Sequence, residues 1–417
     1  MNATDTLSNT VNICSNITVP SGKTLVIQPN STVKFYSGKY LQVQGKLTAN
    51  GSASQHIKFT SAATTPSRGN WEYIRIDNYA SSSYLNYCDI EYAKTGIWVN
   101  GANANPTIQN CEIKECSQYG VRIENNGTNK TTFKHNNVHH NSVYGVFLMT
   151  NSAPTMLNIT ATNNGHSGLV CYNSSPKIGS VETEEAVQSK FRKNSQHGIW
   201  CTGSSGSSPV IYRNTKINPS GGYVRLDSNA VNGLRADNGS QPHLGESSSS
   251  PGYNSICDNG SVEIWNGNSS YSITAKYNWW GSESGPPPDS CNNSLLLARP
   301  YLNYDPGNPA KAGFTPPLAS DDTSHISRLQ RGEIYFAAGE LEQALSIFEQ
   351  IISDNPKSED AKYALSAIVL CYQELDWQDQ IVPYLDKVAE QYPKQDIGYW
   401  ILGHGAFGPV VGDRGEI

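Results

Sequence analysis

Along the chain, glycine is repeatedly followed by an apolar residue, any residue and a second apolar residue. The six phrases are TGIWV, YGVRI, YGVFL, SGLVC, HGIWC and NGLRA, with glycines at Gly96, Gly120, Gly145, Gly168, Gly198 and Gly233. The first three spacings are 24, 25 and 23 residues, whereas the last two, 30 and 35, indicate loop insertions. Apolar and polar residues alternate locally, which predicts short β-strands. A repeat of this length, built from short strands, predicts a solenoid of the right-handed parallel β-helix type.

Successive side chains of a strand point to opposite faces, so the apolar pair of each phrase is expected to face the core and the residue between them solvent. The expected inner pairs are Ile97/Val99, Val121/Ile123, Val146/Leu148, Leu169/Cys171, Ile199/Cys201 and Leu234/Ala236. The glycine is expected to form a corner of each coil. Asn141, Asn164 and Asn194 each stand four residues before a repeat glycine, and Cys116 holds the same place before Gly120. They predict a ladder of stacked, hydrogen-bonded amides along the axis.

Several phrases resemble a known family. The stretches VPSGKTLVIQP, LQVQGKLTANGS, GNWEYIRI and NWWGSESGP are similar to secreted bacterial right-handed β-helix proteins of the pectate-lyase-like superfamily, over about residues 13–288. The resemblance implies a β-helix with an N-terminal cap over residues 1–300. It implies little about function, because such relatives include polysaccharide lyases, glycoside hydrolases, adhesins and surface proteins without known activity.

The pattern then becomes helical. After a Pro- and Asn-rich linker at 301–323, LQRGEIYFAAGELEQALSIFEQIISDNP has apolar residues three and four apart. It resembles a tetratricopeptide repeat, with Gly332, Ala344 and Phe348 at matching offsets, and predicts such repeats over 324–417. A third copy fails at GHGAFGPVVGDRGEI, so either the chain is cut short there or it ends in a natural irregular tail.

Composition and charge narrow the function classes. Hydrophobic residues make up 37% and charged residues 16%, a balance that suits many turns and strands. The net charge is −6 without a basic run, which argues against nucleic-acid binding. We expect no membrane span. The N-terminal residues do not resemble a signal peptide; either a signal was removed or the protein is cytosolic, and the resemblance favours a secreted or cell-surface protein. The nine cysteines lack CxxC spacing, which favours core thiols over disulfides.

The residues between the apolar pairs are candidates for ligand contact. In order they are Trp98, Arg122, Phe147, Val170, Trp200 and Arg235, and two positions further on lie Asn100, Glu124, Met149, Tyr172, Thr202 and Asp237. Aromatic rings stack on sugar faces while polar neighbours bind hydroxyls. We therefore expect Trp98, Phe147, Tyr172, Trp200, Arg235 and Asp237 to bind polysaccharide. The alternative is a packing surface covered by the C-terminal segment or by a partner chain.

Catalysis has weaker support. If it occurs, we expect Arg122 to neutralise an acidic sugar, Glu124 to act as acid or base, and His166 and His197 to relay protons. Glu124 and Asp237 lie about four coils apart, roughly 19 Å by strand spacing, whereas glycosidases need carboxylates about 5–9.5 Å apart. No cofactor or metal site is expected, although a lyase of this superfamily would bring Ca²⁺.

Three functions remain open. The first is an extracellular polysaccharide-binding scaffold whose helical repeats contact a protein partner. The second is a carbohydrate-active enzyme, either a lyase or a glycoside hydrolase, acting on the same face. The third is a purely structural surface module. The first is preferred, because no pair of carboxylates at catalytic distance is evident.

Overall fold

The structure is a computed structural model. It describes residues 4–77, 82–179, 188–211, 223–245, 252–268, most of 270–298, and 328–337, 341–375 and 377–393. The chain divides into two compact units, Met1–Gly313 and Phe314–Ile417. The expected linker at 301–323 and the failing third helical copy lie outside the described residues.

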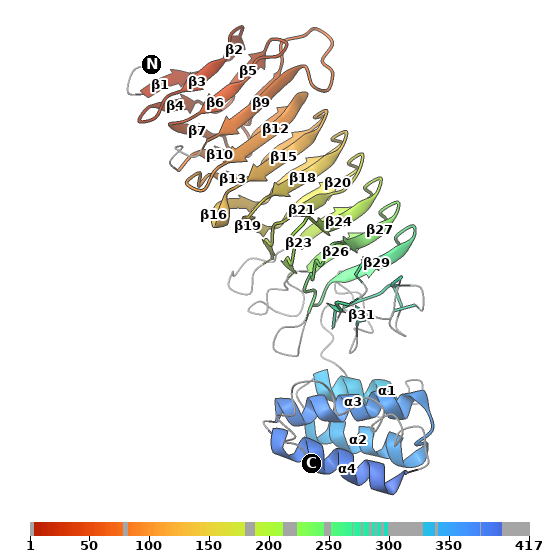
Figure 1. Ribbon diagram of the computed structural model, residues 1–417. Coiled ribbons are helices and arrows are strands. Elements are labelled where there is room, and N and C mark those ends of the chain that lie inside the picture. Colours follow the sequence, from red (N-terminus) through yellow and green to blue (C-terminus); the bar gives the residue numbers. More distant parts are fainter. Residues whose placement is uncertain are drawn as a thin grey trace. The chain divides into compact units, whose positions relative to one another are not determined.

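Three long parallel sheets run side by side along the first unit (Figure 1). In the described residues, the first sheet consists of β1 (Thr4–Leu7), β4 (Thr24–Ile27), β7 (Lys46–Asn50), β10 (Tyr84–Asn86), β13 (Thr107–Gln109), β16 (Gly127–Lys134), β19 (Ser152–Leu157), β22 (Lys177–Ile178) and β25 (Val210–Ile211). The second consists of β2 (Thr10–Ile13), β5 (Thr32–Phe35), β8 (Ile57–Ser61), β11 (Cys88–Glu91), β14 (Glu112–Lys114), β17 (Asn137–His139), β20 (Thr160–Thr162), β23 (Gln188–Arg192), β26 (Tyr223–Asp227) and β28 (Ser255–Cys257). The third consists of β3 (Ile17–Val19), β6 (Leu41–Val43), β9 (Trp71–Ile76), β12 (Ala93–Asn100), β15 (Tyr119–Glu124), β18 (Tyr144–Met149), β21 (Leu169–Tyr172), β24 (His197–Thr202), β27 (Asn232–Ala236) and β29 (Val262–Asn266). A short parallel pair, β30 (Ile273–Thr274) and β31 (Leu296–Leu297), follows.

Each coil of the solenoid contributes one strand to each sheet in turn. In the third sheet, β12 therefore pairs in parallel with β9 on one side and β15 on the other, with Val99 opposite both Ile76 and Ile123. The predicted parallel β-helix is confirmed. The extra residues of the two longest repeats, 180–187 and 212–222, fall between strands of the first and second sheets and lie outside the described residues.

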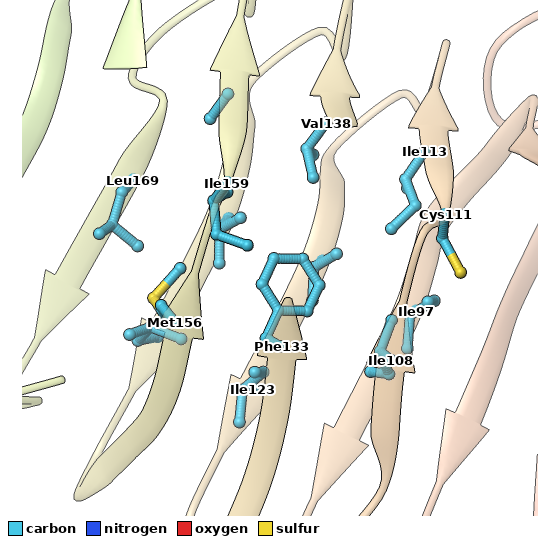
Figure 2. Packing of buried hydrophobic residues seen from close by; sticks show 14 of the residues in the cluster. Ile97, Ile108, Cys111, Ile113, Ile123, Phe133, Val138, Met156, Ile159 and Leu169 are labelled. Atoms are coloured by element: carbon cyan, nitrogen blue, oxygen red, sulfur yellow. The ribbon is translucent and has the colours of Figure 1, made fainter. Parts of the chain in front are cut away.

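The core fills the space between the three sheets. All the predicted inner pairs are buried, with 0% of each residue exposed. Figure 2 shows side chains from all three sheets, such as Ile97, Phe133 and Val138, meeting in this interior. Burying each such side chain contributes about 1.5–3 kcal/mol relative to leaving it in water. Because one coil cannot bury its own inner face, stability comes from stacking the coils.

The expectation that the repeat glycines form corners is wrong. Gly96, Gly120 and Gly145 lie inside β12, β15 and β18, and none of the six repeat glycines has a positive φ. A Cβ on Gly145 would lie 2.6 Å from the carbonyl oxygen of Gly168 and 2.8 Å from Nδ2 of Asn164. Glycine is therefore required because neighbouring coils approach each other too closely for a side chain.

Single residues in the left-handed conformation make the corners instead. Between the first and second sheets these are Asn9, Asn30, Tyr87, Asn110, His135 and Asn158. Between the second and third sheets they are Tyr92, Glu115, His140, Asn163, Lys193, Ser228 and Asp258, with φ between 53° and 64°. Asn, Asp and His adopt this conformation more readily than most residues, but Tyr and Lys do so here because the coil on either side fixes the turn.

A ladder of asparagine side chains beside the third sheet is confirmed. Oδ1 of Asn164 accepts hydrogen bonds from the backbone N–H and from Nδ2 of Asn141, at 3.2 and 3.0 Å. Asn194 accepts the same two bonds from Asn164, and the ladder continues to Asn229 and Asn259. It satisfies buried backbone donors where the chain turns between sheets. A second ladder, which the sequence pattern did not predict, runs through Ser152, Ser174, Ser207 and Ser240.

In the second unit the described residues form α1 (Arg328–Ala337), α2 (Leu341–Asp354), α3 (Glu359–Glu374) and α4 (Gln378–Gln391). The apolar spacing predicted helices here, and Ala344 and Phe348 of α2 are fully buried. A Cβ on Gly332 of α1 would lie 2.5 Å from the Phe348 ring, so this glycine lets the two helices pack closely.

Candidate functional site

One row of side chains runs along the outer face of the third sheet, and we refer to it as the central row. Strand register places Arg122 opposite Trp98 on one side and opposite Phe147 on the other, as the repeat predicted. In the described residues the row comprises Thr18, Gln42, Arg75, Trp98, Arg122, Phe147, Val170, Trp200, Arg235 and Trp265. Val170 differs from the expected solvent-facing position because it is only 1% exposed, flanked by the larger Phe147 and Trp200.

A second outer row lies two residues further along each strand. Register aligns Asn100, Glu124, Met149, Tyr172 and Thr202. Asp77 and Asp237 directly follow the paired positions Ile76 and Ala236 and extend this row at either end. The predicted contact residues Tyr172 and Asp237 are half-buried in this row. The two rows together are the recognition face discussed below.

Each arginine of the central row is paired with an acid of the second row. Arg75 Nε lies 2.6 Å from Asp77 Oδ1, Arg122 Nε lies 3.0 Å from Glu124 Oε2, and Arg235 Nε lies 2.6 Å from Asp237 Oδ2. The three sequences IRID, VRIE and LRAD share the order apolar, Arg, apolar, acid. Residues two apart in a strand lie on the same face, which brings each cation and its acid together. Arg75 and Asp77 were not among the predicted site residues, although the IRID phrase carries the signal.

The two tryptophans complete two similar clusters. The indole N–H of Trp98 donates to Glu124 Oε1 of the next coil at 2.9 Å. That of Trp200 donates to Asp237 Oδ2 of the next coil at the same distance. Trp98 and Trp200 are four coils apart in register, which corresponds to roughly 19 Å at normal strand spacing.

Stacking along the axis occupies the faces of these two indoles. The guanidinium carbons of Arg75 and Arg122 lie 4.2 and 4.8 Å from the centre of the Trp98 ring. Since Arg75 and Arg122 belong to the coils on either side, they cover both faces of the ring. Trp200 likewise stacks on His166 at 5.5 Å, with Arg235 5.8 Å away. The expected stacking of sugar rings on Trp98 and Trp200 therefore has no free indole face.

Between the two clusters lies an aromatic group that the sequence reasoning only partly identified. Phe147 stacks on Tyr119 with ring centres 5.3 Å apart, and Tyr144 lies 5.9 Å from Tyr119. Tyr119 and Tyr144 precede the repeat glycines in QYGVRI and VYGVFL, and this repeated Tyr-Gly pair was the available signal. All three side chains are half-buried, so this group offers aromatic surface between the clusters.

The two predicted catalytic histidines lie together near Trp200. Their ring centres are 6.0 Å apart, and His197 is only 3% exposed. Burial, with the positive charge of Arg235 nearby, lowers the pKa of His166. Burial and then Arg235 and His166 lower the pKa of His197 to about 4. Both imidazoles are consequently neutral at pH 7.

We expect acid to weaken the fold through His197. The unfolded side chain has a pKa of about 6.5, so the unfolded state binds more protons between about pH 6.5 and 4. The stability that neutral His197 contributes to the fold is therefore complete above pH 6.5 and is lost as the pH falls towards 4. We expect a loss of roughly 2 kcal/mol in the free energy of unfolding, measured by denaturant titration at pH 7 and 4.5.

The matched variant is His197→Asn, because Asn232 occupies the same row in the next coil. It should unfold with a smaller difference between the two pH values. Asn137→Ala, at an exposed position on β17, removes no titratable group and should keep the wild-type difference. An equal pH dependence in wild type and His197→Asn would contradict this assignment.

The structure brings the four predicted catalytic residues together only as two pairs. Arg122 and Glu124 bind each other on β15, whereas His166, just before β21, lies two coils further along the third sheet and His197, on β24, lies three coils further. Both oxygens of Glu124 already accept hydrogen bonds, from Trp98 and Arg122. Glu124 and Asp237 are four coils apart by register, beyond the separation that glycosidases use.

In the part of the chain that the structure describes, no three His, Cys, Asp or Glu side chains gather to hold a metal ion. No helix among the described residues is long and apolar enough to cross a membrane.

Comparison with known families agrees with the two units. A family model described as the right handed beta helix region matches residues 9–164 and 127–217, which together span half of the chain. A tetratricopeptide repeat model matches residues 327–358, which contain α1 and α2. The comparisons with curated proteins and with solved structures found no match.

Proposed function

The chain belongs to the right-handed β-helix family, and we propose that its solenoid is a polysaccharide-binding scaffold whose tetratricopeptide unit contacts a protein partner. The observation that carries the proposal is the recognition face itself. It combines half-buried aromatic rings, guanidinium groups and carboxylates in straight rows on one parallel sheet. A straight row with a regular coil repeat suits a ligand that also repeats along its length.

The contact chemistry on this face suits sugars. The Phe147, Tyr119 and Tyr144 group supplies apolar area for C–H faces. The arginine–acid pairs on either side supply hydrogen-bond donors and acceptors for hydroxyl groups. We also propose that the protein is secreted or lies at the cell surface, because that is where it would meet an extracellular polysaccharide.

The arrangement favours binding over an enzyme. Glu124 is held by Trp98 and Arg122, and the nearest acid of the second row, Asp77, lies two coils away, roughly 10 Å at normal strand spacing, and is held by Arg75. The histidines are too far along the solenoid to exchange a proton directly with Glu124. A lyase or glycoside hydrolase on this face would need a different set of acid and base groups.

A polysaccharide array with the purified protein tests the proposal. We expect retention on at least one polymer without formation of reducing ends or unsaturated products. Phe147→Ala should weaken binding about three- to tenfold, since aromatic contacts of this kind contribute about 0.5–1.5 kcal/mol. Trp200→Ala should weaken it similarly, because it also releases Asp237 and Arg235.

The control is Tyr36→Ala, which removes an aromatic ring that is 52% exposed outside the recognition face. It should bind as wild type does. Failure to bind any polymer on the array would overturn the proposal. Product formation that is lost in Glu124→Gln but kept in Tyr36→Ala would instead establish the enzyme.

A further inference from the structure

The recognition face is electrically balanced, and we infer that it takes a neutral polysaccharide and discriminates against polyuronates and other acidic polymers. This inference rests on the proposed function and specifies the substrate class of the same site. It differs from the expectation that Arg122 neutralises an acidic sugar, because the structure gives Arg122 an acid of its own.

The charges on the face cancel pair by pair. Arg75, Arg122 and Arg235 each contact the acid two residues further along the chain, at 2.6 to 3.0 Å. The acids are more deeply placed than the cations: Asp77, Glu124 and Asp237 have side chains 9%, 11% and 18% exposed. Water therefore screens them poorly, and each holds its arginine firmly.

An anionic ligand would meet an unfavourable field here. A carboxylate that approaches Arg122 or Arg235 also approaches Glu124 or Asp237 within a few ångströms, and like charges at that distance repel. The chain as a whole carries a net charge of −6, which adds long-range repulsion of a polyanion.

A neutral sugar meets no such conflict. Each hydroxyl group both donates and accepts hydrogen bonds, and a carboxylate beside a guanidinium presents acceptors and donors next to each other. Two such pairs, at Glu124 and Asp237, flank the aromatic group at Phe147. The face thus alternates polar pairs with an apolar patch along the solenoid axis.

Affinity electrophoresis of the full chain in gels with a neutral β-glucan, a neutral galactomannan, polygalacturonate or alginate tests the inference. We expect a neutral polymer to retain the protein, with affinity for both acidic polymers at least tenfold weaker. Retention should change little between about 0.05 and 0.5 M NaCl, since no counterions need be released. Equal or tighter binding to an acidic polymer, falling steeply with salt, would overturn the inference while leaving the proposed function intact. Binding to no polymer would overturn both.

The double variant Glu124→Gln/Asp237→Asn tests the charge balance directly. The amides keep an oxygen that can accept from Trp98 and Trp200, but two guanidinium groups lose their counter-charge. We expect salt-sensitive retention on polygalacturonate, at least fivefold tighter than in wild type.

Glu112→Gln/Asp89→Asn makes the same change in net charge on the second sheet, where these acids pair with Lys114 and His56. It should leave polygalacturonate binding unchanged. If both double variants gain affinity equally, or if neither gains any, the charge balance of the recognition face does not set specificity.

Discussion

Replacing Gly145 by alanine is expected to destabilise the solenoid by about 3 kcal/mol, although the change adds a single methyl group. The new Cβ would lie 2.6 Å from the Gly168 carbonyl oxygen and 2.8 Å from Asn164 Nδ2. Both atoms are fixed, the first by the backbone of the next coil and the second by the asparagine ladder. The coils must therefore separate locally, which also weakens the hydrogen bonds between β18 and β21. The measurement is the free energy of unfolding from denaturant titration, followed by the β-sheet circular dichroism signal.

The control is Gly38→Ala, where a Cβ would meet nothing within 4 Å but φ is +69°. It should cost only about 1 kcal/mol, the price of a left-handed alanine. If Gly145→Ala proved no more costly than Gly38→Ala, close approach of the coils would not be the reason for glycine in the repeat.

Removal of one rung of the asparagine ladder is expected to have a similar effect. In Asn164→Ala, the backbone N–H of Asn141 and one of its Nδ2 hydrogens lose their acceptor, while the Val138 carbonyl loses a donor. These groups are buried, and an unsatisfied buried group costs about 1–3 kcal/mol. We expect a loss of about 3 kcal/mol, measured in the same titration.

Two further variants identify the cause. Asn164→Asp keeps the acceptor but places an oxygen where Nδ2 donates to Val138 and Asn194, so it should also be destabilised at pH 7. Asn137→Ala, an exposed outward position on β17, should change stability by less than about 0.5 kcal/mol. A mild effect of Asn164→Ala, close to that of Asn137→Ala, would mean that water or local rearrangement replaces the rung.

Much of the fold could be predicted because one repeat carries several constraints at once. The phase of alternation in YGVRI alone assigns Val121 and Ile123 to the core and Arg122 to solvent, and both assignments hold. The spacing of Asn141, Asn164 and Asn194 likewise predicted their ladder. These features repeat with the coil, so a sequence pattern is enough to find them.

The corners could be predicted only in part, because Asn is common at them but many other residue types also occur there. Tyr87, Glu115 and Lys193 take a left-handed conformation that is unfavourable for their types, held by the coils above and below. Conversely, the repeat glycines suggested corners, whereas glycine is required there because the neighbouring coil leaves no space for a side chain. A glycine in a sequence indicates that a side chain is excluded, but does not say whether the cause is φ or a close neighbour.

The chemistry of the recognition face could be predicted only in part from the sequence. The outward positions were identified, but the contacts between coils were not, because they depend on which side chain of one coil meets which of the next. Arg75 lies on β9, whose register with β12 shifts between Thr95 and Ile97. Because of this shift, the repeat pattern did not identify Arg75. Its position over Trp98 is what removes a free ring face from the site.

The in-register pairing of the coils has a consequence for engineering. Because each coil repeats the same three strands and the same ladder rungs, one period such as the residues from Gly120 to Tyr144 is an interchangeable module. Adding or deleting whole periods would lengthen or shorten the molecule in increments of about 4.8 Å without rotating any side chain to the opposite face. The distance between Trp98 and Trp200 can thus be set by design, in steps of one coil.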